Sequence, residues 1–344
     1  MKKILNLLPL LVATLLSALL FSYSAFAFVG TEVEKAPSGI KDTGEIPLKE
    51  PLFNTSLPIE SALSNSSSSG SSVQVNASKG DAVGTIFEQF LSPYKAKYSY
   101  NGVYMKNNTG LAVDLKTELA KKVELKLASG TEPQVLIIHT HATECYMGEE
   151  RDFYTASDKF RTTNNDRNVT HIGELIAEKL RAGGIGVIHD RTHHDHPAYN
   201  GSYSRAAKTI NAYLKQYPSI KIVLDVHRDS IAMTGNDRCK PTVSIKGKKA
   251  AQVMLVMGSQ TGSVSGYPNW RKNFRLALGF QQTMEALYPG LARPAVLCSA
   301  NYNQNLTTGS MLLEVGTDSN TFEEACYSAE LAGDALLNLL NTLK

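Results

Sequence analysis

Three residues with metal-binding side chains directly follow an apolar run. The stretch 135–144 is Val-Leu-Ile-Ile-His-Thr-His-Ala-Thr-Glu, so His139, His141 and Glu144 come at the end of a predicted buried strand. Imidazole nitrogens and carboxylate oxygens are ligands that zinc takes in proteins. Side chains at the carboxyl end of a strand in an α/β sheet lie where such sheets place their binding crevice. The pattern therefore predicts a metal site at this strand end.

A second apolar run, 220–226, ends directly before His227. A catalytic zinc has three protein ligands and an open position for water. We assign the metal to His141, Glu144 and His227, with Glu144 folding back from a turn so that it and His141 grip one ion. Strand alternation would point His139 to the same side as His141. His139 is then the alternative first ligand, or a residue that supports the ligands or binds substrate.

A third apolar run, 311–315, contains Glu314. A carboxylate is costly to bury without a purpose. Beside a zinc site, Glu314 suits a general base that takes a proton from a metal-activated water. It could instead form a structural salt bridge with Arg228. Otherwise Arg228 is expected to stabilise an oxyanion or grip a substrate carboxylate.

A competing cluster of possible metal ligands is His193-His194-Asp195-His196, which is predicted to lie in a loop with its histidines pointing in different directions. We favour a loop beside the cleft over a second metal site. It leads into candidate substrate-binding residues that suit an amide- and hydroxyl-rich ligand: Tyr199, Asn200, Tyr203 and Arg205.

The spacing of apolar residues predicts an α/β fold. Helices are expected at 169–180, 203–214, 274–287 and 323–340. Further strands are expected at 185–188, 253–257 and 296–298. Strands that alternate with helices indicate a mixed, mostly parallel sheet with helices on both faces.

The N-terminal part divides into three segments. Lys2 and Lys3 precede an apolar run over 4–28, long enough to span a bilayer as a helix. Its length favours a retained anchor, although Ala25-Phe26-Ala27 is similar to a signal-peptide cleavage site. Either way, the remainder is expected outside the cytoplasm. Residues 29–83 are predicted to be a flexible Ser-rich linker.

Residues 84–130 are predicted to be a lead-in segment, with a hairpin pairing 103–106 with 111–114, and residues 131–344 the main domain. The net charge is +3 with scattered basic residues, so nucleic acid is not an expected partner. The four cysteines form no Cys-x-x-Cys pair, which excludes a structural zinc finger.

Four motifs together resemble the stage II sporulation protein P family. They are His-Thr-His-x-Thr-Glu at 139–144, Tyr-Asn-Gly-Ser-Tyr-x-Arg at 199–205, Asp-x-His-Arg-Asp at 225–229 and Leu-x-Glu-Val-Gly at 312–316. The resemblance covers roughly residues 100–344. This family looks like a branch of the zinc-dependent N-acetylmuramoyl-L-alanine amidases, whose fold is a mixed sheet flanked by helices.

The resemblance implies zinc on His141 and His227, with Glu314 as the catalytic carboxylate. The usual amidase glutamate ligand opens the first helix, but residues 166–169 here contain no Glu, so Glu144 is assigned in its place. The resemblance further implies peptidoglycan cleavage during forespore engulfment, a membrane anchor, and cooperation with stage II sporulation proteins D and M. Cutting of the peptide cross-link is a possible second activity. The alternatives are a zinc carboxypeptidase acting on stem peptides and a non-enzymatic, zinc-stabilised wall-binding module.

Overall fold

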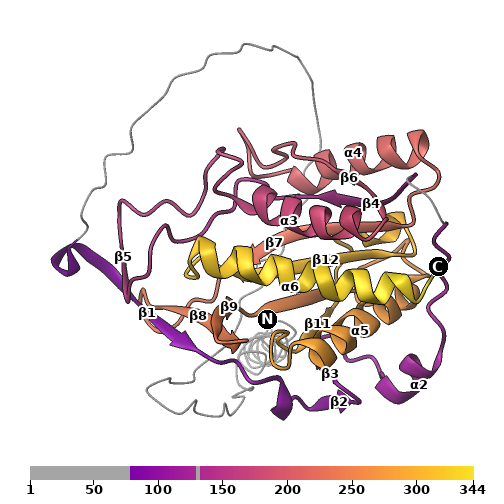
Figure 1. Cartoon of the computed structure of the whole chain (residues 1–344), viewed down its shortest axis with the longest axis horizontal. Helices are drawn as coiled ribbons and strands as arrows, with labels where there is room; N and C mark the ends of the chain where they lie inside the picture. The colour runs from indigo at the N-terminus through magenta and orange to yellow at the C-terminus, as the bar shows by residue number, and fades with distance from the viewer. Residues whose placement is uncertain (1–77, 129–131) are drawn as a thin grey trace, which may run out of the picture.

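The computed structural model describes residues 78–128 and 132–344. These residues form two β-sheets with helices packed against the larger one (Figure 1). The predicted membrane segment 1–28 and nearly all of the predicted linker 29–83 lie outside the described residues. Among the residues that are described, no helix combines the length and apolar character needed to cross a membrane.

The larger sheet has eight strands in the order β2-β3-β11-β10-β12-β7-β4-β6. Only the β2–β3 and β10–β12 pairings are antiparallel, and the other neighbours are parallel, so the predicted mixed and mostly parallel sheet is confirmed. The strand bounds are β2 (Tyr98–Tyr100), β3 (Val103–Asn107), β4 (Pro133–Ile138), β6 (Gly186–His189), β7 (Ile222–Asp229), β10 (Val253–Gly258), β11 (Ala295–Cys298) and β12 (Ser310–Thr317).

Helices cover both faces of this sheet, as the spacing of apolar residues predicts. The helices α3 (Val169–Ala182), α5 (Trp270–Leu287) and α6 (Phe322–Asn341) lie side by side across one face (Figure 1). The opposite face packs against α4 (Ser202–Gln216) through the apolar residues Ala206 and Ile210. A short helix, α2 (Leu115–Ala120), contacts α5.

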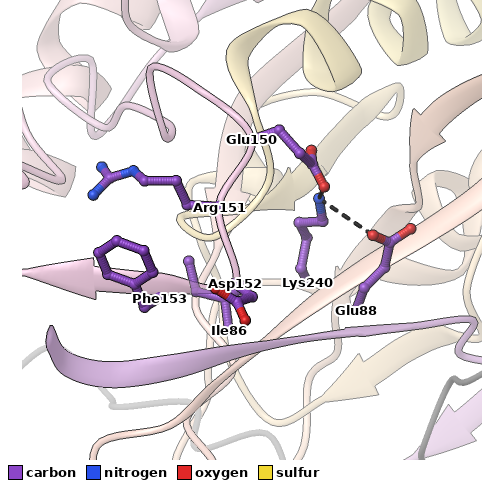
Figure 2. Close-up of a pocket in the computed structure, with 7 residues that line it drawn as sticks. All are labelled: Ile86, Glu88, Glu150, Arg151, Asp152, Phe153 and Lys240. Atoms are coloured by element: carbon purple, nitrogen blue, oxygen red, sulfur yellow. Dashed lines mark hydrogen bonds and ion pairs between the residues drawn. The ribbon is translucent and has the colours of Figure 1, made fainter. Parts of the chain in front are cut away.

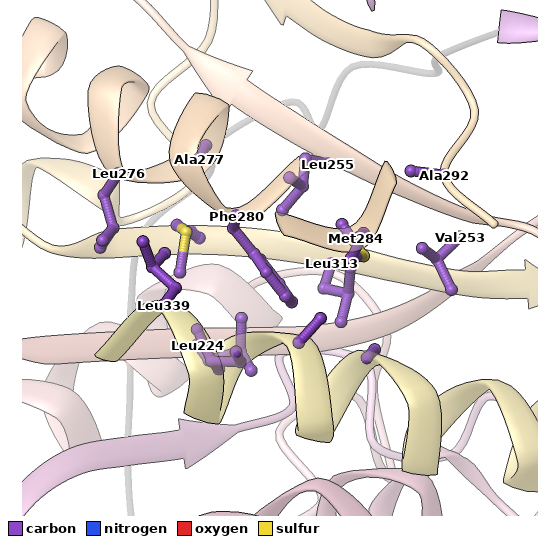
Figure 3. Close-up of a cluster of buried hydrophobic side chains, with 14 of the residues drawn as sticks. Leu224, Val253, Leu255, Leu276, Ala277, Phe280, Met284, Ala292, Leu313 and Leu339 are labelled. Carbon is purple, nitrogen blue, oxygen red and sulfur yellow. The ribbon is translucent and has the colours of Figure 1, made fainter. Parts of the chain in front are cut away.

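The main core lies between the sheet and the helices α5 and α6. Phe280 and Met284 of α5 pack with Leu339 of α6 against Leu255 and Leu313 of the central strands (Figure 3). All five side chains are buried, so removing them from water stabilises the layer that fixes the central strands.

A second, four-stranded sheet was not predicted from the sequence. Its order is β5-β1-β8-β9, and the bounds are β1 (Ala82–Gln89), β5 (Phe153–Thr155), β8 (Arg238–Ile245) and β9 (Lys248–Ala251). The buried Lys240 of β8 joins this sheet to α6, because its Nζ lies 2.6 Å from Glu150 and 3.1 Å from Glu324. Figure 2 shows Lys240 beside Glu88 and Glu150 in a pocket of about 470 Å³.

The predicted hairpin between 103–106 and 111–114 is wrong. β3 pairs instead with β2, through a turn at Asn101 (φ 48°) and Gly102 (φ 76°). Two consecutive residues with positive φ give the hairpin turn whose twist matches that of the strands, and Asn-Gly is its preferred sequence. The segment 111–114 forms no strand. The side chain of Asn107 closes the turn before it, accepting from the Thr109 N–H and donating to the Leu111 carbonyl.

The predicted lead-in segment 84–130 contributes strands to both sheets. Most of β1 lies in this segment and pairs with β8 of the second sheet, and β3 pairs with β11 of the larger sheet. The division into a lead-in at 84–130 and a domain at 131–344 stays a prediction, with these pairings joining the two.

A glycine inside α3 makes room for two buried histidines. A Cβ added at Gly173 would lie 2.6 Å from Nε2 of His139 and 3.0 Å from Nε2 of His189. We therefore expect Gly173→Ala to lower the thermal midpoint, because overpacking of about 1–3 kcal/mol exceeds the helix-propensity gain of about 1 kcal/mol.

The matched control is Gly279→Ala in α5, where the added Cβ would meet Leu339 at an ordinary 3.4 Å. This change should leave the thermal midpoint unchanged or raise it. Thermal unfolding followed by circular dichroism checks both variants, and a Gly173→Ala protein at least as stable as the parent would contradict this account of α3.

Candidate metal centre

Three neighbouring parallel strands end at the same edge of the larger sheet. The register pairs Ile138 of β4 with Asp225 of β7, and His227 of β7 with Glu314 of β12. Because parallel strands present their carboxyl ends together, residues separated by more than 80 positions in the sequence meet here. The meeting of three strand ends, expected from the apolar runs, is confirmed.

His141, Glu144 and His227 converge in a buried cluster. One ligand atom from each lies within 4.8 Å of the other two. Nδ1 of His141 is 3.5 Å from Glu144 Oε1, and Nδ1 of His227 is 3.2 Å from Oε2 of the same carboxylate. The backbone N–H of Glu144 donates to the carbonyl of His141 at 3.1 Å, so the predicted fold-back turn is present.

The donor set and its spacing fit zinc. Two imidazoles and one carboxylate are a zinc ligand set, and adjacent ligands of a tetrahedral zinc lie about 3.3 Å apart for bonds of about 2.0–2.1 Å. The contacts of 3.5 Å from Glu144 Oε1 to His141 and of 3.2 Å from Oε2 to His227 are close to this spacing, and all three ligand atoms lie within 4.8 Å of one another.

Glu144 lies beside the first turn of α3. The N–H of Val169 donates to the carbonyl of Glu144 at 2.9 Å, and Cys145 forms a β-bridge with Asn168. The amidase resemblance implied a glutamate ligand at the start of this helix. The carboxylate of Glu144 therefore comes from a neighbouring segment that lies against the same helix end.

Two supporting residues were missed from the sequence. Nε2 of His141 contacts the Ser202 hydroxyl at 3.1 Å. Nε2 of His227 lies 2.9 Å from Asp225 Oδ1, as an ion-pair contact rather than a well-aligned hydrogen bond. Asp225 is itself held by the N–H and the hydroxyl of Thr140, at 2.8 and 2.6 Å. Such partners on the outer nitrogen orient metal-binding histidines.

Alternation along β7 could have identified Asp225, because it lies two residues before His227 on the same face of the strand. No comparable signal identifies Ser202, because its contact with His141 depends on how the start of α4 meets the sheet.

The cluster holds a negative charge between two rings. Burial opposes ionisation of Glu144, but its hydrogen bonds with His141 and His227 outweigh burial and hold its pKa well below the usual range. Burial would likewise lower the pKa of His227, but Asp225 and Glu144 together hold it well above the usual range. Metal binding therefore competes with protonation of the His227 ring.

The prediction that His139 points to the same side as His141 is wrong. β4 ends at Ile138, so strand alternation does not extend through the turn that follows. His139 is completely buried, with Nδ1 2.8 Å from the Val226 carbonyl and Nε2 2.9 Å from His189 Nε2. Both ring nitrogens therefore have protein partners, and these contacts do not support His139 as a ligand or a substrate-binding residue.

Glu314 lies beside the cluster with one oxygen unsatisfied. Within residues 78–128 and 132–344, its buried Oε2 has no hydrogen-bond partner. Burial raises the pKa of Glu314 to about 8, with His227 and Arg293 opposing the rise and Asp229 and Glu144 adding to it. A carboxyl group that titrates near neutral pH can both accept and donate a proton.

Gly316 shapes the strand directly after Glu314. It has φ +64°, a conformation that suits glycine, and the β12–β7 register shifts between Glu314 and Thr317. An added Cβ would lie 2.8 Å from Ala251 Cβ. The glycine of the Leu-x-Glu-Val-Gly motif therefore permits the bulge that ends β12 after its carboxylate.

The alternative of a Glu314–Arg228 salt bridge is not what the structure shows. The Arg228 guanidinium donates to the carbonyls of Cys145, Phe160 and Asp229 at 3.1, 2.7 and 3.5 Å. Its backbone N–H donates to Glu144 Oε2 at 3.3 Å. Arg228 thus holds the segment that carries Glu144, and its catalytic role in oxyanion or carboxylate binding stays a prediction.

The predicted substrate-binding residues divide into two groups. Tyr199 is 50% exposed and stacks on His141 with ring centroids 4.5 Å apart, and Tyr203 meets the same ring edge-on at 5.5 Å. Arg205 instead donates to the loop carbonyls of His194, Ala198 and Asn200. The two tyrosines border the metal cluster, while Arg205 and the carbonyl of Asn200 hold their own loop together.

The side chains of the competing run at 193–196 contact different partners and do not converge on one point. His193 contacts Asn165, His194 lies 3.7 Å from Asp190, and Asp195 binds Thr143 and Arg161. Among the described residues, the only group of three or more candidate ligands within reach of one ion is His141, Glu144 and His227. The preference for a loop beside the cleft is consistent with this dispersal.

The raised pKa of Glu314 predicts a pH-dependent stability. The folded protein keeps this proton up to about pH 8, whereas an unfolded glutamate loses it near pH 4.5. Stability contributed by protonated Glu314 is therefore present below pH 4.5 and is lost as the pH rises toward 8. We expect Glu314→Gln to stabilise the metal-free protein increasingly from pH 5 to 8, by on the order of a few kcal/mol at the upper end.

Chemical denaturation of both proteins in a chelator, at several pH values, measures this difference. A difference in the free energy of unfolding between the parent and the Gln variant that stays constant with pH would show that Glu314 ionises normally.

A family model described as Stage II sporulation protein P matches residues 64–337. The Stage II sporulation protein P of Bacillus subtilis (strain 168) is 28% identical over 234 residues, which cover 64% of this chain and 54% of that protein. The chain thus spans about half the length of this curated relative.

Similar solved structures include the N-acetylmuramoyl-L-alanine amidase from Clostridium difficile 630, at 13% identity and a TM-score of 0.36, covering 62% of this chain and 97% of that one. The CwlD amidase from Clostridioides difficile, solved in complex with the GerS lipoprotein, has 11% identity and a TM-score of 0.37, covering 61% and 99%. On the match of the family model to most of its length, this chain belongs to the stage II sporulation protein P family.

Proposed function

We propose that this protein is a zinc-dependent peptidoglycan hydrolase that cleaves the amide bond between N-acetylmuramic acid and L-alanine. The proposal places it outside the cytoplasm of a sporulating bacterium, anchored by segment 1–28, where it acts during forespore engulfment with stage II sporulation proteins D and M. Membership of the family supports the role in sporulation. The family resemblance supports the partners, the anchor and the bond that is cleaved.

The observation that carries the chemistry is the position of Glu314 beside the three candidate ligands. Glu314 pairs in register with His227, and its pKa of about 8 responds to the charges of His227 and Glu144. Two histidines and a carboxylate that converge beside a proton-transferring carboxyl group form the arrangement that metal-assisted amide hydrolysis requires.

His141, Glu144 and His227 would hold the zinc, which when bound polarises a carbonyl and makes water a nucleophile at neutral pH. Glu314 takes the proton from the attacking water at its free Oε2 and returns it to the departing amine. Asp225 and Ser202 keep the two imidazoles oriented. Tyr199 and Tyr203 border the cluster and provide apolar surface for the sugar and peptide on either side of the amide.

The ligand assignment predicts a loss of metal. Replacing His141, Glu144 or His227 individually by Ala should lower the zinc content of the purified protein well below one per chain, because each change removes one of three ligands. His194→Ala is the matched control, since His194 is also buried but lies 3.7 Å from Asp190 and outside the cluster.

Zinc content is measured by elemental analysis of folded, dialysed protein. Full occupancy in all three ligand variants, or loss of zinc from the His194 variant, would overturn the assignment.

The role of Glu314 predicts a separation of catalysis from metal binding. Glu314→Gln keeps the size of the side chain but cannot accept a proton. We expect the variant to keep its zinc and its binding to cell wall, while turnover falls roughly 10²–10⁴-fold, as expected for the loss of a general acid–base group.

The measurement is the release of products from purified peptidoglycan per zinc-loaded molecule. Intact stem peptides that begin with L-alanine identify an amidase, shortened stems a carboxypeptidase, and bound but uncut wall a binding module. Near-normal release by the Gln variant would remove Glu314 from the mechanism.

A further inference from the structure

Arg161 lies beside the candidate metal centre, and none of the four sequence motifs contains it. Its backbone forms an antiparallel bridge with Glu144, and its guanidinium NH2 group is 3.5 Å from Glu144 Oε1. Because Glu144 is a candidate ligand, this guanidinium contacts a residue that would itself contact the ion.

Its orientation is fixed from two directions. NH1 donates to Asp195 at 2.7 Å and to the Thr143 hydroxyl at 3.2 Å. The guanidinium also lies over the Tyr199 ring, 4.8 Å from its centroid, and the same ring stacks on His141 at 4.5 Å. The stack His141–Tyr199–Arg161 therefore holds one edge of the guanidinium in place beside the metal-binding histidine.

The opposite edge of the guanidinium remains accessible. The Arg161 side chain is 42% exposed, whereas its partner Asp195 is completely buried. NH1 donates to both Asp195 and Thr143, whereas NH2 contacts Glu144 only at the long distance of 3.5 Å. An arginine held rigidly on one edge and open on the other is suited to bind a carboxylate through two parallel hydrogen bonds.

We propose that Arg161 is a specificity-determining residue that binds a free carboxylate of the stem peptide close to the amide that is cleaved. The inference rests on the proposed amidase function. In peptidoglycan, the residue after L-alanine is a D-glutamate whose α-carboxylate is either free or amidated. A rigid cation one contact from the ion position can distinguish these two forms, because an amide cannot accept a charge-assisted pair of hydrogen bonds.

The test compares the binding of two zinc-loaded proteins to two muramyl tripeptides. Both proteins carry Glu314→Gln, so that the ligands stay intact, and one also carries Arg161→Met. The tripeptides differ only in a free or an amidated α-carboxylate on D-glutamate. We expect the protein that keeps Arg161 to bind the tripeptide with the free carboxylate roughly 10- to 100-fold more tightly than the amidated one. The protein with Arg161→Met should bind both tripeptides alike.

Asp195→Asn is the matched control, because it removes the charge of the salt bridge but leaves a side-chain oxygen that can still accept the hydrogen bond from the guanidinium. If Arg161 only stabilises its loop, the Asn variant should lose discrimination as the Met variant does. If Arg161 binds the carboxylate, the Asn variant should keep most of it. Zinc content and the thermal midpoint are recorded for every variant.

Equal binding of the two tripeptides by the protein that keeps Arg161 overturns the proposal even if the Met variant fails to fold. Discrimination that survives in a folded Met variant, or no binding of either tripeptide, overturns it as well. The product analysis of digested wall tests the amidase function separately. That function can therefore hold while the role of Arg161 fails, because turnover does not enter the binding comparison.

Discussion

The site depends on a buried carboxylate, that of Glu144, lying between two imidazole rings. Its two oxygens face Nδ1 of His141 and Nδ1 of His227, at 3.5 and 3.2 Å. An ionised carboxylate in the protein interior is stable only when it is paired. The two rings and the Arg228 N–H together satisfy this need. The same constraint would favour a bound cation at the point where the three side chains meet.

The larger sheet and its helices could be predicted because their signals are local. Apolar runs of four to seven residues give β4, β7, β10 and β12, and apolar residues at helical spacing give α3 to α6. The convergence of the three candidate ligands followed from one further rule, that parallel strands present their carboxyl ends at one edge. These parts of the fold and of the site need no knowledge of tertiary contacts beyond the order of the strands.

The parts of the fold and of the site that could not be predicted depend on contacts between distant segments. β1 pairs with β8 across about 150 residues, and only Ile86 and Gln89 of this strand are buried, so no alternating buried face marks it as a strand. His139 was misplaced because β4 ends at Ile138, before both histidines, so strand alternation does not apply in the turn that carries them. Arg161 and Ser202 meet the cluster only through loop and helix positions that spacing does not encode.

The central claim is that one zinc ion binds at His141, Glu144 and His227. Anomalous diffraction from zinc-loaded crystals, collected on both sides of the zinc absorption edge, tests it most directly. The account predicts a single strong peak within about 2.0–2.3 Å of Nδ1 of His141, Nδ1 of His227 and a Glu144 oxygen. A peak among residues 193–196 instead, or none at the three-residue cluster, would contradict it.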